Sequence, residues 1–167
     1  MPLTMTVEEH LVELGSLVDN QEQSVQRVGA RLVEQYFASS STEQDAEVVV
    51  NVLYYLTDIQ VRDYALGLID KDKADTLVPA LTYLMEHAPT DTIYMNAPAS
   101  ILAGLYYEME DTDNAYLALS NAQHNYSLSN LLRRVFGSGW PTEAFAAMRA
   151  ELHPKVTAGI FEGDDND

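Results

Sequence analysis

The stretch from Asn96 to Pro141 constrains the fold of this chain most strongly, because its apolar residues recur at helical spacing on both sides of a short polar turn. The first series occupies positions i, i+3, i+4 and i+7 of one helical face: Ala99, Leu102, Ala103 and Tyr106. Polar residues at 110–114 supply the turn, and a second series follows at Ala115, Leu119 and Ala122. Asn96 is expected to cap the first helix, with Pro98 in its first turn. The stretch therefore predicts an antiparallel helical hairpin that leads into a third helix.

Small residues at the expected contact between these two helices let their backbones approach closely. The spacing resembles a tetratricopeptide hairpin, with Ala103 at the position where that repeat has a small glycine. Such a repeat needs about three copies or more for stability, and one copy is evident in this sequence. Helical hairpins of other families share the same spacing. We therefore expect an all-α fold of antiparallel helical hairpins, either a tetratricopeptide-like array or an irregular helical bundle.

The same periodicity predicts helices on both sides of the hairpin. Their expected ranges are 6–18, 21–37, 42–56, 58–69, 75–87, 128–136 and 142–152. The run Val48-Val49-Val50 could instead begin a strand, but its apolar pattern persists for about ten residues, roughly twice the mean strand length. Helix is therefore favoured there. Within 58–69, Val61 and Ala65 are expected to face the core, whereas Arg62 and Asp63 face elsewhere.

Length and composition suit one domain. The chain has 167 residues, of which 47% are apolar, enough to bury one substantial core. We expect a single helical domain over residues 1–160 and a disordered acidic tail over 161–167. Glu8, Glu9 and Glu13 fall where a signal peptide needs uninterrupted apolar residues, and no run approaches the ~20 apolar residues of a membrane span. Together with the absence of cysteine, these features favour a soluble, cytoplasmic protein with no membrane association.

The acidic charge excludes one class of partner and suggests another. The formal net charge is −17, and no Lys or Arg occurs between Lys73 and Arg133. A surface of this sign repels phosphate, so direct nucleic-acid binding is not expected. The charge serves either solubility alone or attraction to a protein partner with a basic surface. In the second case an alternative function is DNA-mimic inhibition of a nucleic-acid-binding protein or enzyme.

Residue types that support catalysis or metal binding do not occur in productive patterns. No two of the four histidines have the i, i+4 spacing that places two imidazoles on one helical face. The carboxylates within 108–113 lack the glycine and the final glutamate of a calcium loop. Gly137-Ser138-Gly139 does not have the spacing of a nucleophile elbow. We therefore expect no catalytic residue, no metal site and no cofactor, and predict that the protein is not an enzyme.

Protein binding is the function that these features favour. In the helical phase given above, the face beside the buried one consists of Ala97, Ser100, Gly104, Tyr107 and Glu108. In tetratricopeptide-like hairpins this face lines the groove that takes a partner segment. Gly104 would admit a partner backbone, Tyr107 would supply an aromatic anchor and Glu108 would meet a basic residue. The alternative is that the same face packs on neighbouring helices; the partner and the oligomeric state stay open.

Four short motifs, taken in order, resemble a known family. They are Gln60-Val61-Arg62-Asp63-Tyr64-Ala65-Leu66, Ala97-Pro98-Ala99, Tyr126-Ser127-Leu128 leading to Leu131-Leu132, and Gly139-Trp140-Pro141. Over roughly residues 58–150, their spacing resembles the C-terminal helical half of the domain-of-unknown-function family numbered 4192, of actinobacteria and actinophages. The resemblance implies a helical fold and an actinobacterial or phage origin. That family has no assigned activity, so the resemblance implies no catalytic residue.

Overall fold

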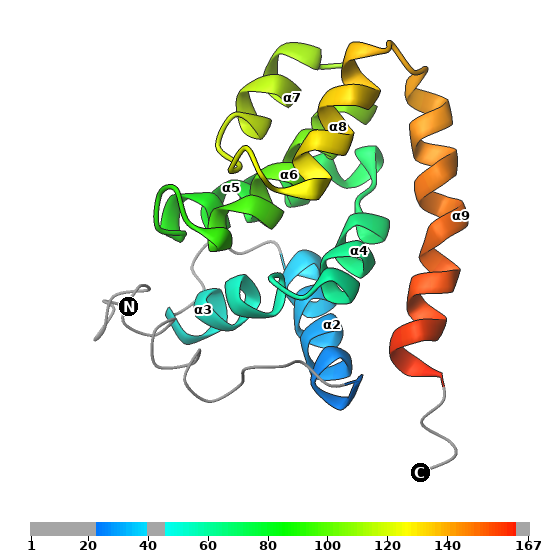
Figure 1. Ribbon diagram of the computed structural model, residues 1–167. Coiled ribbons are helices and arrows are strands. Elements are labelled where there is room, and N and C mark those ends of the chain that lie inside the picture. Colours follow the sequence, from blue (N-terminus) through cyan, green and yellow to red (C-terminus); the bar gives the residue numbers. More distant parts are fainter. Residues whose placement is uncertain (1–22, 40–45, 163–167) are drawn as a thin grey trace.

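The computed structural model describes residues 23–39 and 46–162, and all regular structure within them is helical. Figure 1 shows the helices in chain order. They are α2 (Gln23–Ala38), α3 (Ala46–Tyr55), α4 (Ile59–Leu68), α5 (Ala74–His87), α6 (Ile93–Glu108), α7 (Thr112–Leu119), α8 (Ser127–Gly137) and α9 (Thr142–Phe161), with a short 3-10 helix at Lys71–Lys73. The expected all-α bundle is confirmed. The helix expected at 6–18, the first residues of those expected at 21–37 and 42–56, and the end of the tail lie outside the described residues.

Local sequence signals account for several helix starts. Asp58 precedes α4 in an extended conformation, and its carboxylate accepts from the backbone N–H of Gln60 at 2.8 Å and of Val61 at 3.1 Å. Asp111 caps α7 in the same way through the N–H of Asn114, at 3.2 Å. The run Val48–Val50 lies in α3 and is helical, as its long apolar pattern predicts.

Helix α6 forms the centre of the bundle. It contacts α3, α4, α5, α7, α8 and α9, and Figure 1 shows it running behind α8 with α5 and α7 beside it. Four of its apolar residues have no exposed surface: Ala99, Ile101, Ala103 and Leu105. A helix that is apolar on all sides is typical of a core position, because every face must then be covered.

The predicted α6–α7 hairpin is present, but its first helix begins earlier than expected. The prediction that Asn96 caps this helix is wrong: α6 starts at Ile93, after Thr92, and Asn96 lies inside it. The Asn96 side chain is buried, accepts from the N–H of Gln123 at 2.7 Å and donates to Gln123 Oε1 at 2.9 Å. It therefore joins α6 to the loop after α7, and Pro98 falls in the second turn of the helix.

Helix α9 lies along one side of the molecule, against α4 and α2 (Figure 1). It continues through Phe161, one residue beyond the expected domain boundary at 160. The Phe161 ring packs against Tyr64 with 5.7 Å between ring centroids, and the Arg31 guanidinium lies 5.1 Å from its centroid. Phe161 therefore belongs to the folded domain. Each helix within the described ranges is too short or too polar to span a membrane.

Candidate functional site

The five residues predicted to form a partner-binding face lie inside the protein. Ala97, Ser100, Tyr107 and Glu108 are between 0% and 5% exposed, and Gly104 is also buried. A side-chain carbon added at Gly104 would lie 3.5 Å from Phe145 and 3.6 Å from Leu66, so this position faces α9 and α4. The predicted groove over these residues is therefore wrong. The face packs on neighbouring helices because α6 is surrounded on all sides.

The two most distinctive of these residues have internal partners. Tyr107 stacks on Phe136, with 4.4 Å between ring centroids, and its hydroxyl donates to the backbone carbonyl of Trp140. Glu108 forms an ion pair with Arg149, whose Nη2 donates to Glu108 Oε1 at 2.6 Å. Arg149 Nη1 also donates to the carbonyls of Leu66, at 3.2 Å, and Gly67, at 3.4 Å. Tyr107 therefore joins α6 to α8 and to the connection after it, and Glu108 joins α6 to α9.

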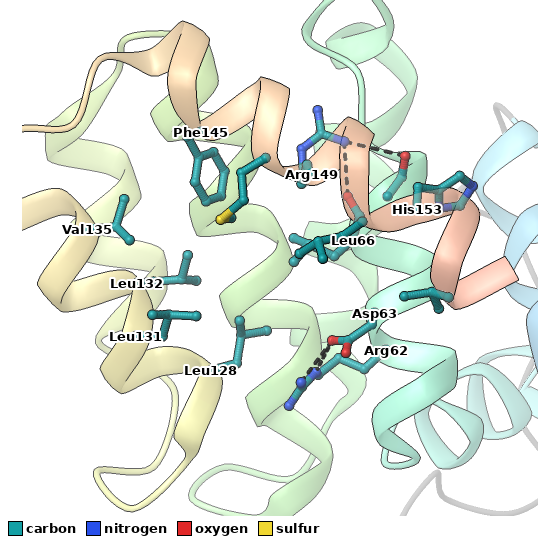
Figure 2. Close-up of a pocket in the computed structure, with 14 residues that line it drawn as sticks. Arg62, Asp63, Leu66, Leu128, Leu131, Leu132, Val135, Phe145, Arg149 and His153 are labelled. Atoms are coloured by element: carbon teal, nitrogen blue, oxygen red, sulfur yellow. Dashed lines mark hydrogen bonds and ion pairs between the residues drawn. The ribbon is translucent and has the colours of Figure 1, made fainter. Parts of the chain in front are cut away.

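Of the openings among the described residues, two have mainly apolar walls and are candidates for binding. The first, which we call the α4–α8–α9 cleft, has a volume of about 210 Å³. Figure 2 shows the α8 side chains on the left of the cleft and Leu66 of α4 across from them, with Phe145 and Arg149 of α9 above. Its wall is mainly apolar and includes Leu66, Leu128, Leu131, Phe145, Met148 and Leu152. Leu131 and Leu152 are 41% and 47% exposed, so they mark its mouth.

The charged side chains of this cleft are already paired. Arg62 is 8% exposed, against the expectation that it faces away from the core. It forms an ion pair with Asp63 at 2.8 Å, and its Nη1 donates to the Tyr126 hydroxyl at 3.4 Å. Burial acts to lower the pKa of Arg62, but Tyr126 and Asp63 outweigh it and the pKa is raised. The Arg62 guanidinium therefore stays protonated, and the Asp63 carboxylate balances its charge.

His153 lies on the α9 side of the cleft. Burial, reinforced by the charge of Arg149, lowers its pKa, with an opposing contribution from Glu34. Its ring lies against Tyr64, with 5.0 Å between centroids. Its Nδ1 is buried without a hydrogen-bond partner and faces Gly67, where an added Cβ would lie 2.0 Å away. The imidazole is therefore neutral at pH 7 and part of the α4–α9 contact.

The second opening, which we call the α5–α6–α7 groove, has a volume of about 300 Å³. Its floor and walls are apolar side chains of the three helices, among them Met85, Met95, Leu102, Tyr106 and Leu117. Leu117 is 65% exposed, the highest exposed fraction of any large apolar residue in the described chain. Glu86, Asn114 and Asn121 provide a polar rim. None of the three helices contains Lys or Arg.

Sequence reasoning missed both openings, although some signals were available. Tyr106 has the helical phase of a core residue, but it lies half-buried in the wall of the groove. Arg149 follows Phe145 by four residues on the inward face of α9, where a cation needs a buried partner. Glu108 carries no comparable signal, because its partner is far away in sequence.

Within residues 23–39 and 46–162, no three His, Asp or Glu side chains are grouped to hold a metal ion.

Comparison with known proteins identifies a family. No curated protein and no solved structure matches the chain. One family model, described as a domain of unknown function (DUF4192), matches residues 6–143. The match begins well before residue 58, where the range of the resemblance starts, and takes in α2 through α8 and the first two residues of α9. Because the match covers most of the sequence, the chain belongs to the DUF4192 family.

Proposed function

We propose that this protein is a non-catalytic binding module that takes a cationic, amphipathic segment of another protein into the α5–α6–α7 groove. The observation that carries the proposal is the pairing of an apolar groove with three helices that lack any cationic side chain. Apolar walls bind the apolar face of a helical segment, as in many helix-in-groove complexes. The surrounding carboxylates then favour Lys and Arg on its polar face.

The side chains of the groove suit a helical segment. Met85 and Met95 are unbranched and adapt to varied partner side chains. Leu117 projects into solvent, and burying it against a partner removes apolar surface from water at roughly 25 cal/mol per Å². Glu86 on the rim and Asp113 on α7 are exposed acids, so neither must break an internal contact to meet a partner's cation.

A DNA-mimic function is the second candidate. The exposed acids Glu86, Asp91, Glu110 and Asp113 favour it, because they fall in the stretch between Lys73 and Arg133 that contains no Lys or Arg. A mimic would act through charge alone by occupying a basic cleft. It therefore predicts a steep dependence of binding on salt and little dependence on apolar side chains.

The remaining parts of the proposal follow from the sequence. We place the protein in the cytoplasm, which the lack of cysteine supports. We regard it as an accessory factor of an actinobacterium or its phage, on the basis of the family resemblance. The net charge of −17 argues against direct nucleic-acid binding.

The test uses a fluorescent helical peptide of Leu and Lys with apolar residues at i, i+3, i+4 and i+7. Fluorescence anisotropy should give saturable binding at about 0.15 M salt. A peptide of the same composition in scrambled order should bind much more weakly, because it has no continuous apolar face. A Leu and Glu peptide of the original pattern should not bind.

Single substitutions then separate the two candidates. Leu117→Ala should weaken peptide binding by about fivefold or more, which corresponds to about 1 kcal/mol. Leu131→Ala, at the mouth of the other opening, is the matched control and should bind normally. If Leu117→Ala binds like the wild-type protein and salt alone releases both peptide orders equally, the groove proposal is wrong and charge mimicry replaces it.

A further inference from the structure

We propose that the α4–α8–α9 cleft is a binding site for a small, uncharged, apolar molecule, of the size of one aromatic ring or a short branched aliphatic chain. This site is separate from the α5–α6–α7 groove and takes a different class of ligand. The inference rests on the enclosure of the cleft, its volume, the state of its charged groups and the way its walls are held apart.

The cleft is deep and closed on most sides. Of its apolar lining residues only Leu131 and Leu152 are exposed, and the others are buried or half-buried. A protein helix needs a long open surface for docking, whereas a narrow mouth with a buried interior suits a small molecule. The enclosure therefore favours a compact ligand over a docked helix.

The volume sets the size of the ligand. The cleft holds about 210 Å³. An engineered apolar cavity of ~150 Å³ in another protein stays free of water and binds benzene. The larger volume in this protein therefore suits one substituted aromatic ring or a branched chain of similar bulk.

The charged groups of the cleft exclude a charged ligand. The Arg62 guanidinium is paired with Asp63, and the Arg149 guanidinium is paired with Glu108 and with two backbone carbonyls. An anionic ligand would have to displace one of these carboxylates, and a cation would face two guanidinium groups. An uncharged ligand disturbs neither pair.

The walls are held apart by their contacts with α6. On the α8 side, Phe136 stacks on Tyr107 of α6. On the α9 side, Arg149 binds Glu108 at the end of the same helix. The Tyr107 hydroxyl also holds the connection between α8 and α9 at Trp140. Because each wall is anchored to α6 separately, the two cannot simply close over the space, and a ligand gains the contacts that the walls lack.

The experiment uses toluene as the probe and methyl-labelled methionine as the reporter. Met148 lines the cleft, and Met85 lines the groove. In a titration followed by NMR, the Met148 methyl signal should shift saturably with toluene, while the Met85 signal should not move. Toluene should also raise the melting temperature, because it binds the folded state. A Met148 signal that does not saturate, or shifts no more than Met85, would overturn the inference.

Variants and a charged analogue complete the test. Met148→Trp fills the cleft and should weaken toluene binding at least tenfold, whereas the matched change Met85→Trp should leave it unchanged. Should Met148→Trp fail to fold, Leu131→Trp at the exposed mouth serves the same purpose. Benzoate has the same ring with a negative charge and should not bind; tighter binding of benzoate than of toluene would refute the uncharged class. Because the peptide assay uses Leu117 and this one uses Met148, either proposal can fail alone.

Discussion

At the residue scale, Glu108 and Arg149 form a buried ion pair between two helices. Their side chains are only 4% and 9% exposed, and the pair joins the end of α6 to α9. A buried ion pair gains little over a well-packed apolar pair, but removal of one partner leaves the other charge without compensation. Replacing either residue alone therefore leaves a buried charge without its partner.

Arg149→Met is expected to destabilise the protein by about 3–5 kcal/mol, because Glu108 is then buried without a counterion. Urea denaturation followed by circular dichroism measures the free energy of unfolding. The double variant Glu108→Leu with Arg149→Met should recover a large part of this loss. If instead the losses of the two single variants simply add, the pair is not coupled and the prediction fails.

The sequence could not identify this pair for a physical reason. Glu108 stands beside a run of acids that are solvated in the structure, among them Glu110 and Asp113. Its burial depends on a cation 41 positions further along the chain, and single-sequence periodicity contains no information on such contacts. The same limit applies to Arg62, which neighbours from α8 and the preceding loop enclose.

At the element scale, the contact between α4 and α9 depends on a residue without a side chain. A Cβ at Gly67 would lie 2.0 Å from Nδ1, 2.6 Å from Cγ and 2.9 Å from Cβ of His153. Rotation of the imidazole cannot relieve the last of these contacts. The two helices therefore approach at this level only because position 67 is glycine.

Gly67→Ala is expected to cost about 1–3 kcal/mol of folding free energy through overpacking. Gly159→Ala, in α9, is the control: its Cβ would meet Gln60 at an ordinary 3.6 Å, so the change should stabilise the protein by about 0.5–1 kcal/mol. Both are measured by urea denaturation. In a His153→Ala background, which lacks the ring atoms, the cost of Gly67→Ala should fall; an unchanged cost would place the strain elsewhere.

Helix periodicity predicted the elements well and their ends less well. The described ranges of α3, α5 and α8 agree with the expected ranges to within a few residues, because each has a continuous apolar pattern and a clear stop. The start of α6 was missed by one turn because both Thr92 and Asn96 have side chains suited to an N-cap. Within the helix, Asn96 accepts from the backbone N–H of Gln123, 27 positions further along the chain, and helical periodicity contains no signal for such a contact.

At the scale of the whole molecule, the main electrostatic feature is the large excess of acidic side chains. The net charge is −17, and the carboxylates behind it repel one another most strongly in the folded state, where they are closest together. Added salt screens that repulsion, with a Debye length that falls from about 30 Å at 0.01 M to about 10 Å at 0.1 M. The stability of the protein should therefore increase with ionic strength in this range.

The melting temperature is expected to rise as NaCl increases from about 0.01 M to about 0.1 M, because screening reduces the repulsion among carboxylates. Calorimetry measures it directly. The variant Glu86→Lys should be compared with the wild-type protein in the same salt series. Glu86 is exposed near the C-terminal end of α5, where a cation is favoured. This variant should melt higher at low salt and respond less to NaCl. A melting temperature that falls with salt would mean that attractive pairs dominate.

The openings of the bundle belong to this scale and could not be predicted from periodicity. The cleft exists because α8 and α9 are each anchored to α6 and meet chiefly through a short connection. The groove lies between α5 and α7, over Met95, Leu102 and Tyr106 of α6. Both are properties of helix placement, whereas the apolar pattern of each helix reports only which of its sides is buried.

Trp140, in the connection between α8 and α9, gives the protein an intrinsic optical signal at an informative place. It is the only tryptophan in the sequence and is 41% exposed. Its backbone carbonyl accepts from the Tyr107 hydroxyl, so the main chain at Trp140 is held to α6 at the connection between the two walls of the cleft. Indole emission responds to the polarity around the ring. Without any added label, the emission maximum of this protein therefore reports on the surroundings of the connection between α8 and α9.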